Sequence, residues 1–399
     1  MREISVSRIL ALERICKMDF KRLENFMDYL TGWRIPGCGC KVYKKGELVF
    51  EYSSGYADME NKIPLSCDDH RMFMYSISKI VTCVTALTLW EEGKYLLSDP
   101  VSMYMPEWAD VKVREWSPDG NHKIHPLERE ITIRDLFCMT SGLDYNCESE
   151  HIMAKRKETE PHCPTVEIIR ALAKDPMNAQ PGQIWGYGLS HDVIGALVEI
   201  WVGEPLGVVA KKRIFDPIGL KKTSYGLDPA YRDEMAVQYC FNDAKNCIEK
   251  NWTQDNWAIF GDEYHSGGAG VVSTISEMAL LMKVLAAKGK VDDNTYIISP
   301  RTIDMMRAPH LTEEEEKGLE WPHLAGYSYG LGVRTMKDPA KGGSTSPVGE
   351  FGWTGAAGGY AMIDPDNEIA VFYAHHMLNN QEHFVAPRIR NIVYSCINN

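Results

Sequence analysis

Strand-like segments gather at the two ends of this 399-residue chain, and helical patterns fill the middle. Residues 35–58 alternate apolar and polar side chains around a Lys45-Gly46 turn, which is typical of a β-hairpin. Further strand-like segments follow one another between residues 327 and 377. The simplest packing of this order is an antiparallel sheet built from both ends of the chain, with a helical lobe inserted between them.

This order predicts an α/β (α+β) fold with two lobes. Residues 1–72 and 262–399 are expected to form a lobe with an antiparallel sheet flanked by helices, and residues 73–261 a mainly helical lobe. A first helix is expected within residues 6–30, because apolar residues recur there at helical spacing. We expect the active site between the lobes, where ligand-binding clefts commonly form.

Composition narrows the possible partners. The 43 Lys and Arg residues against 55 Asp and Glu give a net charge of −12, which disfavours binding to nucleic acid or to anionic membranes. The first twenty residues interrupt every apolar run with Arg or Glu, unlike a signal peptide, and no segment is apolar enough for a spanning helix. The 11 cysteines lack C-x-x-C spacing, which favours reduced thiols and predicts a cytoplasmic protein. Among them, Cys38 and Cys40 fit a core strand better than a metal site.

A short motif suggests a nucleophile. In "MYSISKIV", Ser76 and Lys79 stand one helical turn apart, so both point from the same face of a helix. A serine hydroxyl is a weak nucleophile until a base removes its proton, and a neutral Lys79 could be that base. Tyr187, in the loop "PGQIWGYG", is a second candidate, because a phenolate beside an ammonium could share the task. Ser190 is expected to cap the helix that follows.

A glycine-rich segment, "EFGWTGAAGGYAMIDP", supplies a third element at residues 350–365. Acyl transfer requires backbone N–H groups aimed at the oxyanion that develops on the substrate. A glycine-rich edge strand can bring such a group close to a ligand. We expect the backbone N–H groups of Ser76 and Ala356 to form this oxyanion hole.

Five segments, in this order, resemble the landmarks of the serine β-lactamase and penicillin-binding-protein superfamily, and most closely those of class C β-lactamases and family VIII esterases. They are "FMYSISK", "ITIRDLFCMTSGL", "PGQIWGYG", "SGGAGVVST" and "WTGAAGGYAMIDP". The resemblance implies that Ser76 is acylated and that Lys79 and Tyr187 serve as base and proton shuttle. It places Trp353, Thr354 and Gly355 in the substrate-binding strand motif usually written K-T-G. It also implies that neither a metal nor an organic cofactor is needed.

The chain departs from the family pattern at two substrate-binding positions. The third position of the family's Y-x-N motif, where Asn recognises an amide side chain, is Leu189. The Lys of K-T-G, which helps to bind a substrate carboxylate, is Trp353. A site that loses such polar partners discriminates against the substrates that need them. Both changes favour uncharged, less amide-like acyl groups. The sequence therefore predicts a carboxylesterase or transacylase for small-molecule ester or amide substrates.

Two other functions remain open from the sequence. The chain could be a β-lactamase or D-Ala peptidase, although the predicted cytoplasmic location opposes this, because cell-wall substrates lie outside the membrane. It could also be a non-catalytic ligand-binding protein with the same fold. The presence of Ser76, Lys79 and Tyr187 together argues against a catalytically inactive site.

A second serine also matches a nucleophile motif. "GYSYG" at residues 326–330 fits the G-x-S-x-G elbow, which would make Ser328 the nucleophile of an α/β-hydrolase. That elbow requires a strand before the serine and a helix after it, whereas a Pro-containing loop precedes this motif and a strand-like segment follows it. We therefore favour Ser76. The acidic run at residues 313–316 is interpreted as a solvated helix face or a flap over the cleft.

Overall fold

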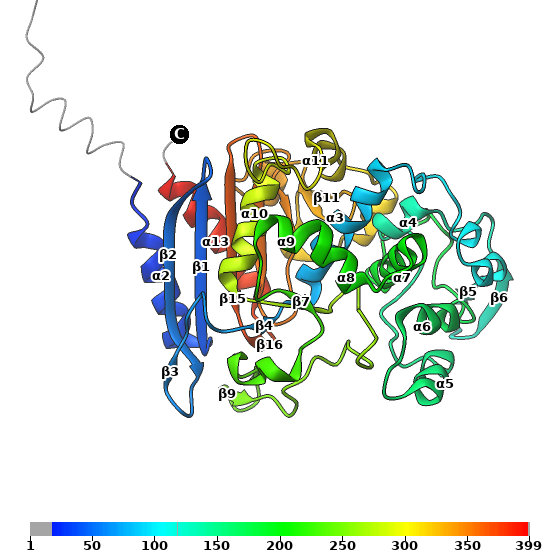
Figure 1. The fold of residues 1–399 in the computed structure, drawn as a ribbon, viewed down its shortest axis with the longest axis horizontal. Coiled ribbons are helices and arrows are strands. Elements are labelled where there is room, and N and C mark those ends of the chain that lie inside the picture. The colour runs from blue at the N-terminus through cyan, green and yellow to red at the C-terminus, as the bar shows by residue number, and fades with distance from the viewer. Residues whose placement is uncertain (1–17, 118, 398–399) are drawn as a thin grey trace, which may run out of the picture.

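The computed structural model describes residues 18–117 and 119–397 (Figure 1). Its centre is an eight-stranded sheet in the order β11-β12-β13-β14-β15-β1-β2-β3. The strands from the start of the chain are β1 (Gly37–Lys44), β2 (Glu47–Asp58) and β3 (Ile63–Pro64). Those from its end are β11 (Tyr327–Tyr329), β12 (Arg334–Met336), β13 (Phe351–Gly352), β14 (Tyr360–Asp364) and β15 (Ile369–His375).

The two ends of the chain meet where β1 pairs with β15. These strands are antiparallel, with Cys40 opposite Tyr373 and Val42 opposite Val371. The other strand pairs of this sheet are antiparallel as well. The predicted fold class, an antiparallel sheet assembled from both termini, is therefore confirmed. The exact lobe boundaries at residues 72 and 262 stay a prediction.

Helices cover both faces of the sheet. On one face, α2 (Lys21–Trp33) and α13 (Glu382–Cys396) share an apolar core with Cys38 and Cys40 of β1. Both thiols are free and fully buried, as expected for a core strand. On the other face, α10 (Ile275–Ala286) packs against β15 and β1 in the larger core (Figure 1). Within the described residues, the predicted first helix corresponds to α2, and the part of the prediction at residues 6–17 lies outside the described residues.

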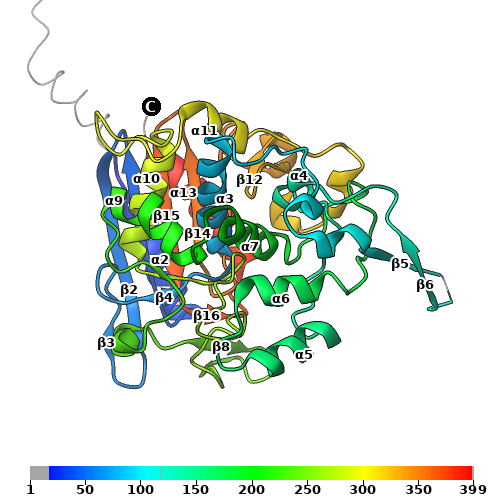
Figure 2. The same cartoon turned by 45° about the vertical axis from the view of Figure 1, so that its right-hand side comes forward.

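The middle of the chain forms the helical part, beyond α10 (Figure 2). Its axis is α3 (Ser78–Glu91), which packs against α7 (Ser190–Val202) and α8 (Leu206–Ala210). Shorter helices complete this part: α4 (Ile133–Phe137), α5 (Glu150–Thr159), α6 (Thr165–Leu172) and α9 (Asp216–Ile218). Between α10 and α13 lie two short helices, α11 (Pro300–Met306) and α12 (Pro339–Gly342).

The helical part holds more strand than the sequence suggested. A hairpin of β5 (Lys112–Trp116) and β6 (His122–Pro126) projects from the body (Figure 2). Most of its side chains are exposed, so no apolar alternation marks it in the sequence. Small sheets also join β8 (Tyr239–Asn242) to β9 (Cys247–Lys250) and β16 (Met377–Leu378), and β10 (Val271–Ser273) to β4 (Met72–Phe73) and β7 (Ser224–Tyr225).

None of the described helices is by itself long and apolar enough to cross a membrane. The segments Ser190–Val202 and Leu206–Ile218 reach that length only as a pair, across a bend of 78°.

Buried histidines predict that the fold weakens in acid. Burial lowers the pKa of His191 and His375 to about 3 and that of His376 to about 4. In the unfolded chain a histidine titrates near ~6.5, so the unfolded state binds more protons below that pH. These residues therefore stabilise the fold above about pH 6.5, and their contribution is lost as the pH falls towards their folded values. At pH 5, each of these three histidines should lower the free energy of unfolding by about 2 kcal/mol.

The free energy of unfolding, measured by denaturant titration at pH 7.5 and pH 5, should show this loss. His191→Asn should reduce the difference between the two pH values, whereas the same change at the exposed His122 should leave it unaltered. Equal pH dependence in the wild type and in His191→Asn would contradict the assignment.

Candidate active site

Ser76 lies on a short 3-10 turn, η1 (Tyr75–Ile77), that leads directly into α3. Its neighbours Tyr75 and Ile77 are buried, and Ser76 itself is partly exposed. Tyr75 has a φ of 44°, in the left-handed region that residues with a side chain rarely adopt. Such strain persists only where surrounding contacts hold it, and here the Tyr75 hydroxyl donates a 2.6 Å hydrogen bond to Gln238. The turn thus leaves Ser76 partly exposed between two buried neighbours.

The side chains of Ser76, Lys79 and Tyr187 converge. The Tyr187 hydroxyl donates a hydrogen bond of 2.6 Å to Ser76 Oγ. The Lys79 ammonium donates to the same oxygen at 3.2 Å. Because both proton-carrying groups lie within bonding distance of one serine oxygen, the arrangement can remove a proton from it and return one.

Lys79 is fully buried and is held by two further oxygen atoms. It donates to the carbonyl oxygen of Gly268 at 2.8 Å and to the Tyr145 hydroxyl at 3.2 Å. Burial alone would lower its pKa, but the oxygens of Tyr145 and Tyr187 outweigh burial, and the pKa of Lys79 is raised. Lys79 is therefore charged at rest, and this charge lies 4.6 Å from the centre of the Tyr187 ring.

Asp192 fixes the turn that carries Gly268. Its Oδ1 accepts hydrogen bonds from Ser266 at 2.7 Å and from Tyr264 at 3.1 Å. Burial raises the pKa of this carboxyl, although the two hydroxyls and Lys79 oppose the shift. Asp192 lies in the first turn of α7, and the cap of that helix is Leu189 and not the predicted Ser190. Ser190 is fully buried, and its hydroxyl instead shares a 2.9 Å hydrogen bond with Ser141.

The glycine-rich segment after β13 packs against the turn that carries Ser76. A side chain at Gly355 would come within 2.5 Å of the carbonyl oxygen of Met74. The Gly355 N–H donates to Gly359, and the Gly358 N–H donates to Gly355. Among the backbone hydrogen bonds of the described residues, none has Ala356 N–H as its donor, and Ala356 is exposed. This N–H is free to donate a hydrogen bond to a ligand oxygen, as an oxyanion hole requires.

The remaining predicted site residues differ in their surroundings. Trp353 is buried, and its Nε1–H donates to the Tyr187 hydroxyl at 3.3 Å. Thr354 is 9% exposed. Leu189 is 3% exposed and belongs to the apolar core, two positions after Tyr187. A substrate-binding role for these residues stays a prediction.

Aromatic rings surround the site more extensively than the sequence suggested. The Tyr187 ring stacks on Tyr145 at 5.4 Å and meets Trp321 edge-on at 5.2 Å. Trp257 in turn meets Tyr145 at 6.0 Å. Sequence reasoning missed Tyr145, Trp257 and Trp321, because all three come from loops whose course no periodic pattern indicates.

Ser328 does not lie on a nucleophile elbow. It is in the middle of β11, fully buried, and β11 pairs with β12. The acidic run also differs from a solvated face, because Glu315 is 4% exposed and accepts the backbone N–H of Thr312.

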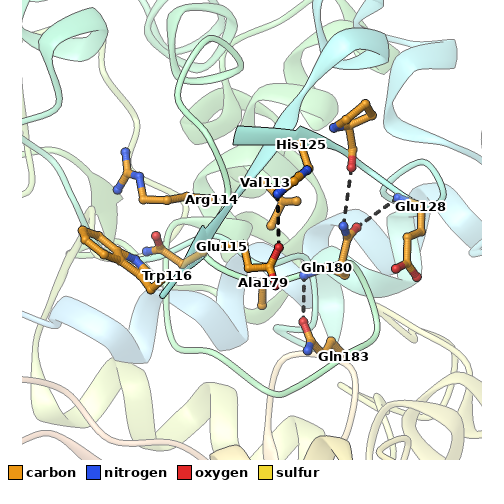
Figure 3. A pocket seen from close by; sticks show the side chains of 11 residues that line it. Val113, Arg114, Glu115, Trp116, His125, Glu128, Ala179, Gln180 and Gln183 are labelled. Atoms are coloured by element: carbon orange, nitrogen blue, oxygen red, sulfur yellow. Dashed lines mark hydrogen bonds and ion pairs between the residues drawn. The ribbon is translucent and has the colours of Figure 1, made fainter. Parts of the chain in front are cut away.

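A separate cavity of about 610 Å³ lies between the β5–β6 hairpin and residues 178–183 (Figure 3). His125 and Glu115 face each other across 3.1 Å in its wall, and Gln180 accepts the backbone N–H of Glu128. None of the predicted site residues lines this cavity. The chemistry is therefore better placed at Ser76, where the proton-carrying groups converge.

One group of described residues has the spacing of metal ligands: His162, Asp262 and Glu263, whose ligand atoms lie within 4.8 Å of one another. All three are exposed, and exposed acidic groups often lie together without a metal.

The chain is similar to known proteins over most of its length. The family model described as "Beta-lactamase" matches residues 23–394. An uncharacterized protein of Mycobacterium tuberculosis (strain CDC 1551 / Oshkosh) is 26% identical over 85% of each chain. Esterase EstB of Burkholderia gladioli is 25% identical over 83% of each. Among solved structures, EstCE1, described as a hydrolase with promiscuous acyltransferase activity, has a TM-score of 0.75 at 24% identity and covers 95% of this chain and 98% of its own.

Gly268→Ala tests whether the surroundings of Lys79 control Ser76. The added methyl would lie 2.5 Å from the Asp192 carboxylate and 3.3 Å from the Lys79 ammonium, so one of them must move. Small displacements of catalytic groups cost up to about 100-fold, so labelling of Ser76 by a fluorophosphonate should slow by roughly 10- to 100-fold. Gly32→Ala is the control, since a methyl there meets no atom within 4 Å. Equal labelling rates in both variants would contradict the expectation.

Proposed function

Because the chain belongs to the beta-lactamase family, we propose that it is a serine hydrolase that forms an acyl-enzyme at Ser76 and acts as a carboxylesterase or transacylase on small esters. The observation that carries this proposal is the pair of hydrogen bonds at Ser76 Oγ, from Tyr187 at 2.6 Å and from Lys79 at 3.2 Å.

In the first half-reaction, Ser76 Oγ attacks the ester carbonyl carbon and loses its proton. Lys79 and Tyr187 are assigned together as the groups that take up this proton, because both bond to Ser76 Oγ. The carbonyl oxygen becomes an oxyanion held by the backbone N–H groups of Ser76 and Ala356. The bond to the alcohol then breaks, and Tyr187 returns the proton to the leaving oxygen.

In the second half-reaction, water attacks the acyl-enzyme and releases the acid. An alcohol that competes with water produces a new ester instead, so hydrolysis and acyl transfer use the same groups.

The residues at two predicted substrate-binding positions favour esters over β-lactams as substrates. Trp353 stands where a lysine would bind a substrate carboxylate, and it uses its only polar hydrogen on Tyr187. Leu189 cannot make the amide hydrogen bond of the Y-x-N motif. The name of the Burkholderia gladioli relative, an esterase, supports the same assignment. The cytoplasmic location stays a prediction.

Hydrolysis of short-chain p-nitrophenyl esters should be measured for the wild type, Ser76→Ala and Ser328→Ala. Removing the nucleophile should lower kcat/KM by about 1,000-fold or more. Ser328→Ala is the matched control, because this serine is outside the site. A chromogenic cephalosporin should be turned over far more slowly than the ester.

Ester turnover that survives in Ser76→Ala, or is lost only in Ser328→Ala, would overturn the proposal. Rapid cephalosporin turnover would favour a β-lactamase, and inertness towards both substrates would favour a ligand-binding protein.

A further inference from the structure

We propose that this site selects its esters by the alcohol portion, and that the preferred alcohol is uncharged and carries an aromatic ring, as in a benzyl ester. Trp321 is the residue assigned to contact that ring. This inference rests on the proposed function, and it names the substrate class of the same site.

The position of the leaving alcohol follows from the proton transfer. When the bond between the acyl carbon and the alcohol oxygen breaks, the electron pair stays on that oxygen, which must receive a proton. Lys79 is fully buried beneath Ser76 and is engaged by three oxygen atoms. Tyr187 is partly exposed and bonds to Ser76 Oγ directly. The leaving oxygen must therefore lie beside the Tyr187 hydroxyl.

Indole rings pack against Tyr187, and one of them bonds to its hydroxyl. Trp353 donates its Nε1–H to that oxygen at 3.3 Å, and its ring stacks on Tyr187 at 5.7 Å. Trp321 lies 5.2 Å from the Tyr187 ring and 6.2 Å from Trp353. Trp353 is buried, whereas Trp321 is partly exposed. Trp321 is thus the ring of this pair that can contact an alcohol bound beside Tyr187.

The segment that carries Trp321 is held firmly in place. The Trp185 N–H donates to the carbonyl oxygen of Glu315 at 2.9 Å, and Gly318 packs so closely on Trp185 that a methyl would lie 1.9 Å from its carbonyl oxygen. On the other side, His323 stacks on Trp321 at 5.8 Å and faces Glu382 at 3.1 Å. Because the segment that carries Trp321 is already fixed, substrate binding does not have to order it. This segment forms a rigid wall that selects alcohols by their shape.

An uncharged ring fits this wall better than a cation. Aromatic rings also attract quaternary ammonium groups, so a choline ester is the natural rival substrate. However, the Lys79 ammonium already lies 4.6 Å from the Tyr187 ring centre, and a second positive charge nearby would be repelled. An aromatic ring, in contrast, gains edge-to-face contacts beyond the area it buries.

The test compares butyrate esters of benzyl alcohol, cyclohexylmethanol and choline. The first two have the same acyl group and alcohols of similar size and acidity, so their ratio of kcat/KM isolates the aromatic contact. The wild type should prefer the benzyl ester over the cyclohexylmethyl ester by about 3- to 10-fold, the size expected for an aromatic pair. The choline ester should be the poorest substrate of the three.

Trp321→Ala should bring the benzyl preference close to one, and Trp321→Phe should retain most of it. Trp257→Ala is the matched control, because Trp257 is also exposed near the site but is separated from Tyr187 by the Tyr145 ring. It should leave the benzyl preference unchanged. Circular dichroism of each variant separates a lost contact from a lost fold.

The outcomes distinguish this inference from the proposed function. If the wild type hydrolyses none of the esters, or if Ser76→Ala hydrolyses them all, the proposed function fails. If hydrolysis depends on Ser76 but the benzyl preference is absent, or is retained in Trp321→Ala, or is lost equally in Trp257→Ala, only the assignment of Trp321 fails. Preference for the choline ester would replace the aromatic alcohol with a cationic one.

Discussion

The structure of the site depends on a single buried charge. Lys79 has no exposed surface, so its ammonium must be satisfied by the protein, and it donates to Ser76, Tyr145 and Gly268. An unpaired charge at this depth would be very costly, and each partner is therefore held by its own contacts. Asp192 fixes the turn of Gly268, and the strained turn at Tyr75 raises Ser76 over the ammonium. The reactive geometry thus follows from the need to satisfy Lys79.

The fold brings these partners together from distant parts of the chain. Ser76 and Lys79 come from the start of α3, Tyr187 from the loop before α7, and Trp353 from the connection after β13. The last of these is placed by the central sheet, whose strands come from both ends of the chain. The site therefore depends on both the central sheet and α3.

Much of this arrangement could be predicted from the sequence, for physical reasons. The sheet was predictable because strand-like segments gather at the two ends of the chain, and the meeting of Ser76, Lys79 and Tyr187 because short motifs occur in a recognisable order. The β5–β6 hairpin was not, because its side chains are mostly exposed and carry no apolar pattern. Trp321 and Tyr145 were missed because tertiary contacts, and not local sequence, place the loops that carry them. The wrong cap at Ser190 has the same origin, since its hydroxyl bonds to Ser141 and not to the helix.

The account is tested most directly by locating the acyl group during turnover. Trypsin cleavage after Arg71 and Lys79 releases a peptide that carries both Ser76 and Ser78, and Ser78 is a built-in comparison because it is buried and accepts the Val271 N–H. After rapid acid quenching of an ester reaction, fragmentation of this peptide by mass spectrometry should place the acyl group on Ser76. An acyl group on Ser78 or on the peptide with Ser328, or no adduct on this peptide while burst kinetics demand an acyl-enzyme, would contradict the account.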